Sequence, residues 1–99
     1  MPKYGSIPKE YTDQMNFITH INVSLGWRTK YCGIFELNYK GVTFYFIDDE
    51  FYFGGQALYS YIHHDIEKFS FFSKAVLSVL PNINFRPDLI HCHDWQTGL

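Results

Sequence analysis

The sequence predicts an α/β fold with a βαβ unit over about residues 42–92 and additional strands before it. Three observations predict this class. Apolar and polar residues alternate over residues 17–25, as they do in a half-buried strand. Apolar residues recur at three- and four-residue spacing over residues 66–80, which is the period of an amphipathic helix. Two short apolar runs, residues 42–48 and 89–92, flank that helix and suit buried strands.

The first part of the chain predicts an irregular entry, a short helix and a strand. Prolines and a glycine interrupt the first nine residues, and KEYTDQMN, residues 9–16, predicts a short helix after Pro8. In the stretch FITHINVSL, alternate residues form the two faces of a strand. The apolar face takes Phe17, Thr19, Ile21, Val23 and Leu25, and the polar face takes His20, Asn22 and Ser24. His20 is therefore expected to face solvent rather than a ligand.

Two more strands and a long loop follow. GWRTK, residues 26–30, predicts a turn into a strand over residues 31–39, and Lys40-Gly41 predicts a tight reversal into a third strand, residues 42–48. That third strand is apolar or aromatic at nearly every position, which favours cover on both faces, as in the middle of a parallel sheet. Residues 51–64 show no period and predict a long aromatic loop of the kind that often carries function.

The last third of the chain predicts a helix and a strand. Asp65 is expected to cap the helix that begins at Ile66, and Pro81 is expected to stop it. The run LIHC, residues 89–92, then predicts a short buried strand. Together with the strand over residues 42–48, these elements predict a right-handed crossover between parallel strands.

Composition places the chain among globular proteins and argues against a nucleic-acid-binding or membrane-spanning protein. It has 99 residues, 46% hydrophobic and 18% charged, which suits one domain or part of a larger one. The net charge of −2 with no basic block excludes the footprint of a nucleic-acid binder. The sequence has no run of 18 consecutive apolar residues, so no membrane-spanning helix is predicted. The start lacks the features of a signal peptide, and Cys32 and Cys92 have no metal-type spacing, so a cytoplasmic protein with free thiols is expected.

Aromatic residues form 20% of the chain, from ten Phe, eight Tyr and two Trp. Such residues bury large areas, and Tyr and Trp keep a polar group for a wet edge or a ligand. An aromatic core is the favoured interpretation, with a sugar-stacking or interface role as the alternative.

Candidate site residues gather where the two predicted strands of the βαβ unit end. Ligands of parallel α/β sheets bind beyond the carboxyl ends of the strands, here Asp48-Asp49-Glu50 and His93-Asp94-Trp95. Asp94 has two interpretations that the sequence leaves open, a cap of a following helix or a group that faces substrate. Trp95 offers a flat apolar face against which a sugar ring packs.

A metal site is not expected. His91 and His93 are two residues apart, so an extended chain points both the same way, as a metal-binding pair requires. Metallo-hydrolases place an Asp-His pair after a one-residue gap, but here Asp94 follows directly and Trp95 stands in place of the histidine. The acidic residues 48–50 are interpreted as a solvated strand end rather than a cation cluster. Neither a GxSxG elbow nor a GxxxxGK phosphate loop is present in the sequence.

Several segments, in order, resemble a known family. They are LGWRTKYCGIFELNYKGVTFYFID, FYF, LYSYIHHDIEKFSFFSKAVLSVLP and FRPDLIHCHDWQTGL. They resemble the starch synthase family of ADP-glucose-dependent glycosyltransferases, to which the bacterial glycogen synthases belong. The most specific pieces are the YCGIF and FYFID strands and the PDLIHCHDWQTGL elbow. The similarity runs across nearly the whole chain.

The resemblance implies a fold, a reaction and a set of site residues. It implies an incomplete Rossmann-like N-terminal domain of a GT-B enzyme over residues 1–99. The family transfers glucose from ADP-glucose to the non-reducing end of an α-1,4-glucan with retention, and needs no metal or other cofactor. Asp94 and Trp95 would line the acceptor side of the cleft, with Tyr59 and Tyr61 near them. No catalytic residue of the family falls within these positions.

The same resemblance implies that the chain is a fragment. The family's lysine-and-glycine donor loop and its second domain are not among these residues, so the chain alone is expected to be inactive. Exposed strand edges and uncovered apolar surface predict self-association. Two other functions stay open at this point: a stand-alone carbohydrate-binding or interaction module with an aromatic loop, and a piece of a metal-dependent hydrolase based on HCHD.

Overall fold

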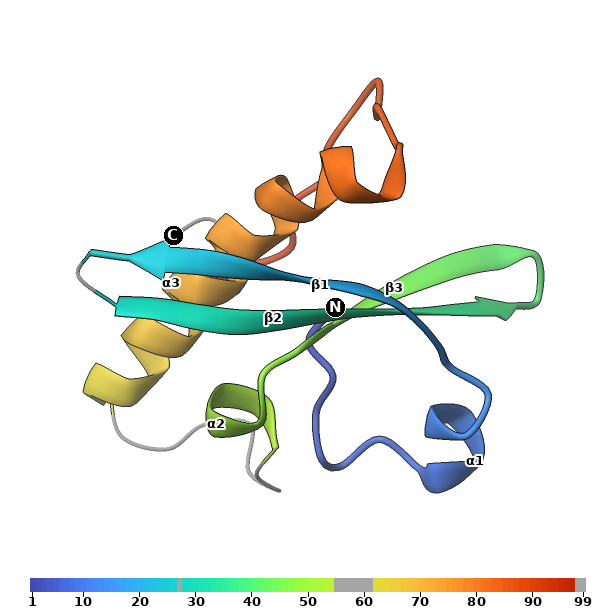
Figure 1. Ribbon diagram of the computed structural model, residues 1–99, viewed down its shortest axis with the longest axis horizontal. Helices are drawn as coiled ribbons and strands as arrows, with labels where there is room; N and C mark the ends of the chain where they lie inside the picture. Colours follow the sequence, from blue (N-terminus) through green and yellow to red (C-terminus); the bar gives the residue numbers. More distant parts are fainter. Residues whose placement is uncertain (27, 55–61, 98–99) are drawn as a thin grey trace.

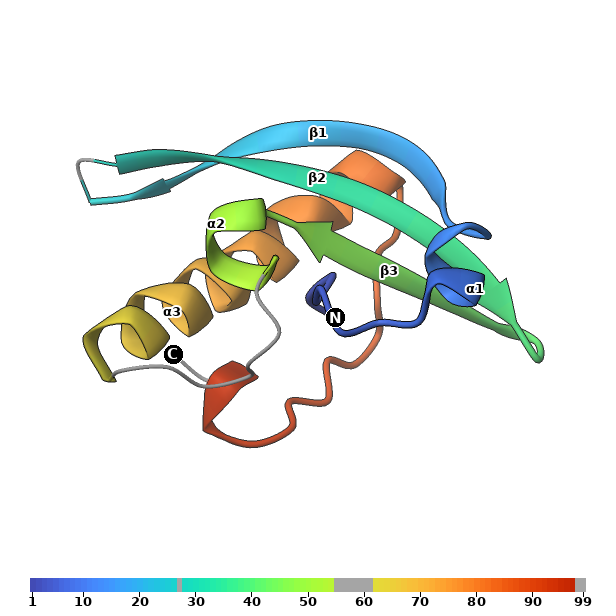
Figure 2. The same cartoon turned by 90° about the horizontal axis from the view of Figure 1, so that it is seen from below.

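The structure, a computed structural model, describes residues 1–26, 28–54 and 62–97. A three-stranded sheet forms one layer, and one long helix, α3 (Ile62–Val79), crosses one of its faces (Figures 1 and 2). The short helix α1 (Lys9–Thr12) begins where the sequence predicts a helix but ends earlier, because Asn16 already belongs to the first strand. None of the helices in this described part of the chain combines the length and the apolar character needed to cross a bilayer.

Two antiparallel pairings build the sheet. Strand β1 (Asn16–Leu25) pairs with β2 (Arg28–Tyr39), and β2 pairs with β3 (Val42–Asp48). All three predicted strands are confirmed, although β2 begins three residues earlier than predicted, inside the predicted turn of residues 26–30. The predicted reversal between β2 and β3 is confirmed too. Lys40 and Gly41 have φ values of 50° and 79°, and a two-residue hairpin turn with both residues at positive φ matches the twist of the strands.

The predicted alternation of β1 is confirmed except at its start. Val23 is buried and Ile21 half-buried, whereas His20 is exposed and stacks on Tyr31 of β2 at 5.4 Å between ring centroids. A β-bulge between Phe17 and Thr19 shifts the register there, so these two residues lie on opposite faces. The prediction that Phe17 shares the buried face is therefore wrong. Its side chain is 52% exposed.

Strand β3 is covered on both faces only towards its end, since Val42 at its start is 54% exposed, and the sheet is not parallel. The adjacent residues Phe46 and Ile47 point to opposite faces, and both are buried. Ile47 belongs to the main core, while Phe46 pairs with Phe35 on the other face, where the Lys3 ammonium lies 5.2 Å from the Phe35 ring centroid. A continuous apolar run indicates burial on both faces of a strand, and an antiparallel strand can be buried on both faces as well as a parallel one.

The first residues of the chain add a short pairing to the edge of β3. The Lys3 N–H donates to the Ile47 carbonyl at 2.8 Å, and the Ile47 N–H donates to the Met1 carbonyl at 2.9 Å. These bonds form an isolated parallel bridge between Pro2 and Ile47. The open edge of β3 is therefore partly closed within the chain itself.

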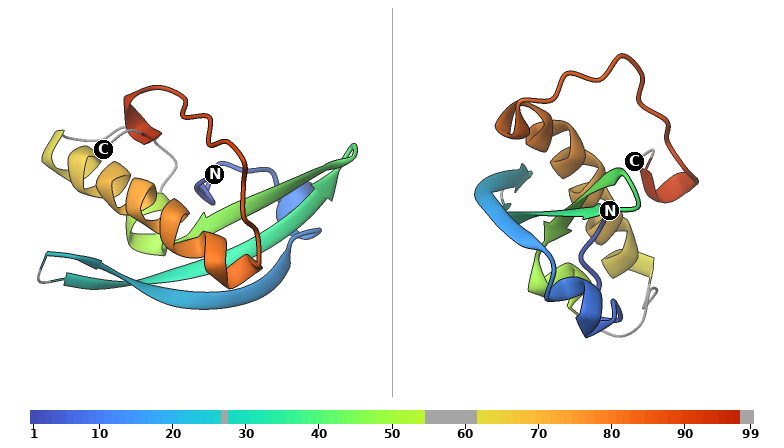
Figure 3. Two further views of the ribbon diagram at one scale, coloured as in Figure 1. Left: turned by 90° about the horizontal axis from the view of Figure 1, so that it is seen from above. Right: turned by 90° about the vertical axis from the view of Figure 1, so that its right-hand side faces the viewer.

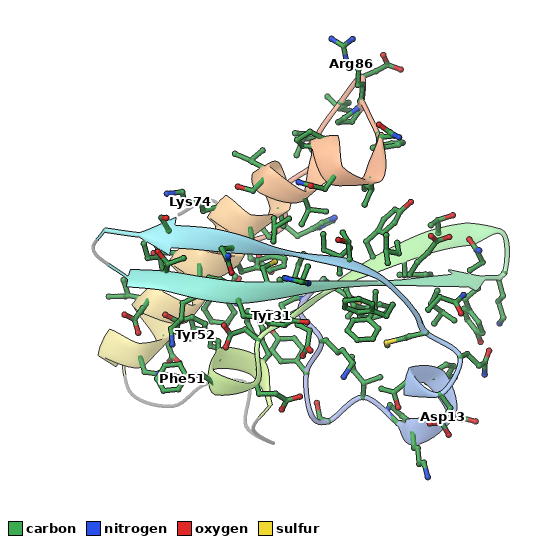
Figure 4. All side chains as sticks on the ribbon, viewed as in Figure 1. Asp13, Tyr31, Phe51, Tyr52, Lys74 and Arg86 are labelled. Carbon is green, nitrogen blue, oxygen red and sulfur yellow. The ribbon has the colours of Figure 1, made fainter. Side chains whose placement is uncertain are left out.

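The segment predicted as one long loop, residues 51–64, contains helical turns at both ends. Helix α2 (Glu50–Phe53) begins after Asp49, whose Oδ1 accepts hydrogen bonds from the N–H groups of Phe51 (3.0 Å) and Tyr52 (3.3 Å). Figure 4 shows Phe51 and Tyr52 projecting from this turn. The missed signal is the Asp49-Glu50 pair, an N-cap residue followed by an acidic first turn.

Helix α3 begins four residues before the predicted start. Asp65 therefore lies in its first turn, and the prediction that Asp65 caps the helix is wrong. Pro81 ends it as predicted, because the chain passes into the 3-10 turn η1 (Leu80–Ile83) and then to Asn84 at φ 54°. The Lys74 ammonium donates a hydrogen bond to the Ser24 carbonyl and ties the helix to β1.

The core lies between α3, α2 and the inner face of the sheet, and it is aromatic, as the composition favours. Phe53 of α2 packs against Phe71 and Phe72 of α3, with ring centroids 6.1 and 6.4 Å apart. The cluster of buried residues comprises Val23, Cys32, Ile34, Ile47, Tyr52, Phe53, Phe71, Phe72, Ala75 and Val79. Aromatic pairs at such distances stabilise a core beyond the area they bury.

The predicted strand over residues 89–92 is not formed, and this overturns the predicted βαβ unit. After η1 the chain turns at Arg86, at the tip seen in Figure 4, and returns along α3 as an extended segment. Leu89 is 83% exposed, and within the described residues no backbone hydrogen bond joins residues 89–92 to another segment. A strand needs a neighbour for its N–H and C=O groups, and the described residues supply none there.

Candidate functional site

A cavity of about 860 Å³ lies between α3, the first residues of the chain and the returning segment. Figure 3 (left) shows the returning segment arching over the N-terminal residues and ending beside α3. The lining residues are Met1, Pro2, Tyr4, Phe69, Phe72, Ser73, Val76, Leu77, Ile90, His91, Cys92, His93, Asp94, Gln96 and Thr97. Most polar side chains of the lining come from residues 91–97, so one part of the cavity is polar and the rest is apolar.

Asp94 stands at the start of a tight turn that residues around it hold in place. The turn is the 3-10 helix η2 (Trp95–Thr97), and Asp94 has φ 61°, in the left-handed region. The Thr97 hydroxyl donates to the carbonyls of His93 (2.8 Å) and Asp94 (3.1 Å). The Ser73 hydroxyl donates to the Gln96 carbonyl at 3.0 Å and fixes the turn to α3. These bonds offset the cost of the left-handed backbone.

The helix-cap interpretation of Asp94 finds no support in this geometry. An N-cap residue has β-region backbone angles and accepts hydrogen bonds on its side chain. Asp94 is left-handed, and in the described part of the chain no N–H donates to its carboxylate. Its carbonyl, not its side chain, accepts from the Thr97 N–H, at 3.4 Å. The exposed carboxylate is thus available to a ligand.

The other predicted cleft residues are less completely described. The backbone of Trp95 opens η2, and its side chain lies outside what the structure describes. Tyr59 and Tyr61 both fall within residues 55–61, outside the described ranges. Sequence reasoning missed Ser73 and Thr97. A polar residue at the apolar spacing of α3, four residues after Phe69, was the available signal for Ser73.

The two predicted strand ends do not meet. Asp94 lines the cavity, but none of residues 48–50 does. Asp49 is instead occupied as the cap of α2. Partial burial raises the pKa of Asp48, Lys3 opposes this shift, and the charges of Glu50 and Asp49 add to it. The acidic residues 48–50 therefore lie at the end of β3 and the start of α2, outside the described lining of the cavity.

His91 and His93 lie side by side, as their spacing predicts, with ring centroids 4.3 Å apart. A metal ion needs further ligands. Within residues 1–26, 28–54 and 62–97, no three His, Cys, Asp or Glu side chains gather in a group that could hold a metal ion.

The two cysteines, both free thiols, differ in environment. Cys92 is exposed and lines the cavity, whereas Cys32 is fully buried in the core. Burial, with added repulsion from Asp49 and Asp48, raises the pKa of Cys32 to about 12. Cys32 therefore stays protonated near neutral pH. Because only the thiolate is a nucleophile, Cys32 is a core residue rather than a reactive thiol.

Comparisons with known proteins agree on one family. The profile of the starch synthase catalytic domain matches residues 1–99. Over all 99 residues the chain is 65% identical to the glycogen synthase of Lachnospira eligens and 56% identical to that of Lachnoclostridium phytofermentans, and it covers 21% of each. The chain thus spans about a fifth of the length of these relatives.

A solved structure gives the same result. This structure is the catalytic domain of Starch Synthase IV from Arabidopsis thaliana bound to ADP and acarbose. It matches with a TM-score of 0.81 and 28% sequence identity, over 97% of this chain and 20% of the other. The predicted α/β class and the resemblance to a GT-B glycosyltransferase domain are thereby confirmed.

Proposed function

The chain belongs to the starch synthase family of glycosyltransferases, and we propose that it forms part of the N-terminal domain of a glycogen synthase. The observation that carries the proposal is the 65% identity to the L. eligens enzyme over every residue of the chain. The whole synthase would transfer glucose from ADP-glucose to the non-reducing end of an α-1,4-glucan, with retention of configuration. The ADP bound in the Arabidopsis neighbour supports this donor, since ADP is the product that ADP-glucose leaves.

We propose that Asp94 and Trp95 belong to the acceptor side of the substrate cleft, with Tyr59 and Tyr61 nearby. Three features of Asp94 support its part: its carboxylate is exposed, it lines a cavity, and Thr97 holds it in a left-handed conformation. Strained backbone positions of this kind cluster at functional sites. A carboxylate there accepts hydrogen bonds from sugar hydroxyls, and such charge-assisted bonds are strong. The indole of Trp95 would supply a flat apolar face for a sugar ring.

The chain alone is proposed to be inactive. Transfer from ADP-glucose requires positive groups or hydrogen-bond donors that stabilise the departing diphosphate. No lysine or arginine side chain appears among the described residues that line the cavity. The remaining four-fifths of a synthase would supply these groups.

The free state of both cysteines supports a reducing compartment, the cytoplasm, as the location.

An activity assay with a chimera tests this function. The chimera is the L. eligens glycogen synthase in which this chain replaces the matching 99 residues. We expect it to transfer radiolabelled glucose from ADP-glucose to glycogen, whereas the isolated chain gives no more label than a blank. An inactive but folded chimera would contradict the proposal. Glycogen binding by the isolated chain, with an inactive chimera, would instead favour the stand-alone carbohydrate-binding module.

We also propose that the isolated chain self-associates through its sheet edges. Within the described residues nothing pairs with the outer edge of β1, and Met1–Lys3 covers β3 only near Ile47. Exposed strand edges with apolar residues recruit other chains, and Ile18 and Val42 are both exposed here. Sedimentation equilibrium should show an average mass that rises with concentration. A monomer at every concentration would contradict this.

A further inference from the structure

Two serines of helix α3 use their hydroxyls in different ways. Ser78 donates to the Lys74 carbonyl at 3.1 Å, one turn earlier in the same helix. Such a local bond is the usual arrangement of a serine inside a helix. Ser73 instead donates to the Gln96 carbonyl at 3.0 Å, 23 residues further along the chain. The Ser73 hydroxyl therefore joins α3 to another segment, whereas the Ser78 hydroxyl stays within the helix.

Ser73 occupies a position of α3 that suits an apolar residue. It lies four residues after Phe69 and three before Val76, and all three side chains line the cavity. Phe69 is buried, and Val76 packs against the core. Serine forms helices less readily than alanine does, and it adds little apolar surface to such a stripe. What the hydroxyl contributes at this position is the bond to Gln96.

The turn η2 that receives this bond is closed by its own residues. The Thr97 hydroxyl donates to the carbonyls of His93 and Asp94, and the Thr97 N–H donates to the Asp94 carbonyl. These bonds fix the shape of the turn but not its place on the protein, because all their partners lie within residues 93–97. The bond from Ser73 ties the turn to α3, which is itself anchored in the core.

From this connection we propose that Ser73 is a positioning residue for the acceptor side of the cleft. Its hydroxyl holds η2 on α3 and so keeps Asp94 in the lining of the cavity. The inference rests on the proposed role of Asp94 as a group that binds the glucan acceptor. Ser73 acts through the backbone two residues after Asp94, because its hydroxyl proton is already given to the Gln96 carbonyl. Groups that bind substrate need such support to hold their geometry.

A matched pair of alanine substitutions in the chimera tests the inference. Ser73→Ala removes the bond to η2, whereas Ser78→Ala removes a serine hydroxyl from a half-buried position of the same helix without touching the turn. We expect Ser73→Ala to lower kcat/KM for glycogen about 3- to 10-fold, the worth of one neutral hydrogen bond. The KM for ADP-glucose should stay within about twofold, and Ser78→Ala should leave both quantities within about twofold.

A double-mutant cycle separates positioning from a general loss of stability. Asp94→Gly adopts the left-handed backbone without strain and leaves no side chain to position. In that background, we expect Ser73→Ala to lower kcat/KM for glycogen by less than about twofold further, because residues that act as one unit are not additive. Fully additive losses would show that Ser73 does not act through the Asp94 carboxylate.

The variant Ser73→Thr keeps a hydroxyl and should keep most of kcat/KM for glycogen. A loss as large as that of Ser73→Ala would show that the hydroxyl is not the group that matters. Hydrogen–deuterium exchange of the isolated chain at low concentration adds a readout that does not need the chimera to fold. Ser73→Ala should speed exchange of residues 94–97 about threefold or more, and Ser78→Ala should not, because only Ser73 restrains this turn.

The outcomes separate this inference from the proposed function. If Asp94→Gly lowers kcat/KM for glycogen but Ser73→Ala keeps it within about twofold, the inference is overturned and the role of Asp94 stands. If Asp94→Gly has no effect, the role of Asp94 fails and the inference fails with it. Unchanged exchange of residues 94–97 in Ser73→Ala would overturn the inference even where the chimera gives no kinetics.

Discussion

Substitutions at Asp94 separate its backbone role from its side-chain role, because its φ of 61° divides the possible replacements into two classes. Asparagine, like aspartate, tolerates the left-handed region, and glycine adopts it without strain. Alanine at such a position costs roughly 1–2 kcal/mol. Asp94→Ala therefore mixes a folding defect with any loss of function, whereas Asp94→Asn removes only the charge.

For stability, we expect Asp94→Ala to lower the free energy of unfolding by about 1 kcal/mol relative to Asp94→Asn. For a chain of this length a loss of that size lowers Tm by about 4–8 °C. Asp94→Asn and Asp94→Gly should leave Tm nearly unchanged, because no described N–H depends on the carboxylate. Thermal unfolding followed by circular dichroism at a fixed concentration measures all three.

For function, the same variants in the chimera should lose kcat/KM for glycogen with ADP-glucose. A hydrogen bond to a charged group contributes about 1.5–3 kcal/mol, so the expected loss is roughly 10- to 150-fold. Asp94→Asn should show that loss at an unchanged Tm. If Asp94→Asn keeps kcat/KM within about twofold, Asp94 does not contact the acceptor in the transition state, and its placement in the cleft is refuted.

Three further predictions follow from the core and the ionisable groups. Phe71→Ala should lower the free energy of unfolding of the chimera by about 3–5 kcal/mol in a urea titration, because the Phe71 side chain is fully buried. Phe51→Ala should cost far less, because the Phe51 side chain is 58% exposed. Similar costs for the two substitutions would contradict the described core. Cys92 should react with iodoacetamide in the native isolated chain and Cys32 only after unfolding, as peptide mass mapping would show; equal labelling of both would contradict the burial that raises the pKa of Cys32 to about 12. Asp48→Asn should raise Tm near neutral pH, because the pKa of Asp48 in the folded chain lies above its ordinary value and ionisation of this carboxyl therefore opposes folding. The gain in Tm should shrink as pH falls through the raised pKa and vanish below the ordinary value. A gain in Tm that grows towards acid pH would contradict this prediction.

The sequence by itself determined the local elements and the family. The alternation around Val23, the Lys40-Gly41 turn and the helical spacing of Phe69, Phe72 and Val76 each reflect an interaction between near neighbours, so the strands, the reversal and the helix could be predicted. The ordered motifs from YCGIF to HCHDWQTGL indicated the starch synthase family, and the comparisons confirmed it.

Only the tertiary structure decided how those elements pair and what surrounds Asp94. The apolar run of β3 favoured a parallel sheet, but the two-residue turn at Lys40-Gly41 makes β2 its antiparallel neighbour, and the predicted strand over residues 89–92 that would have run parallel to it is not formed. The bulge that exposes Phe17 depends on register, and the hydroxyls of Ser73 and Thr97 reach the turn at Asp94 only after α3 is in place. The apolar run of residues 89–92 gives the same local signal as a formed strand. Whether it pairs depends on a partner strand, which the described residues of this chain do not contain.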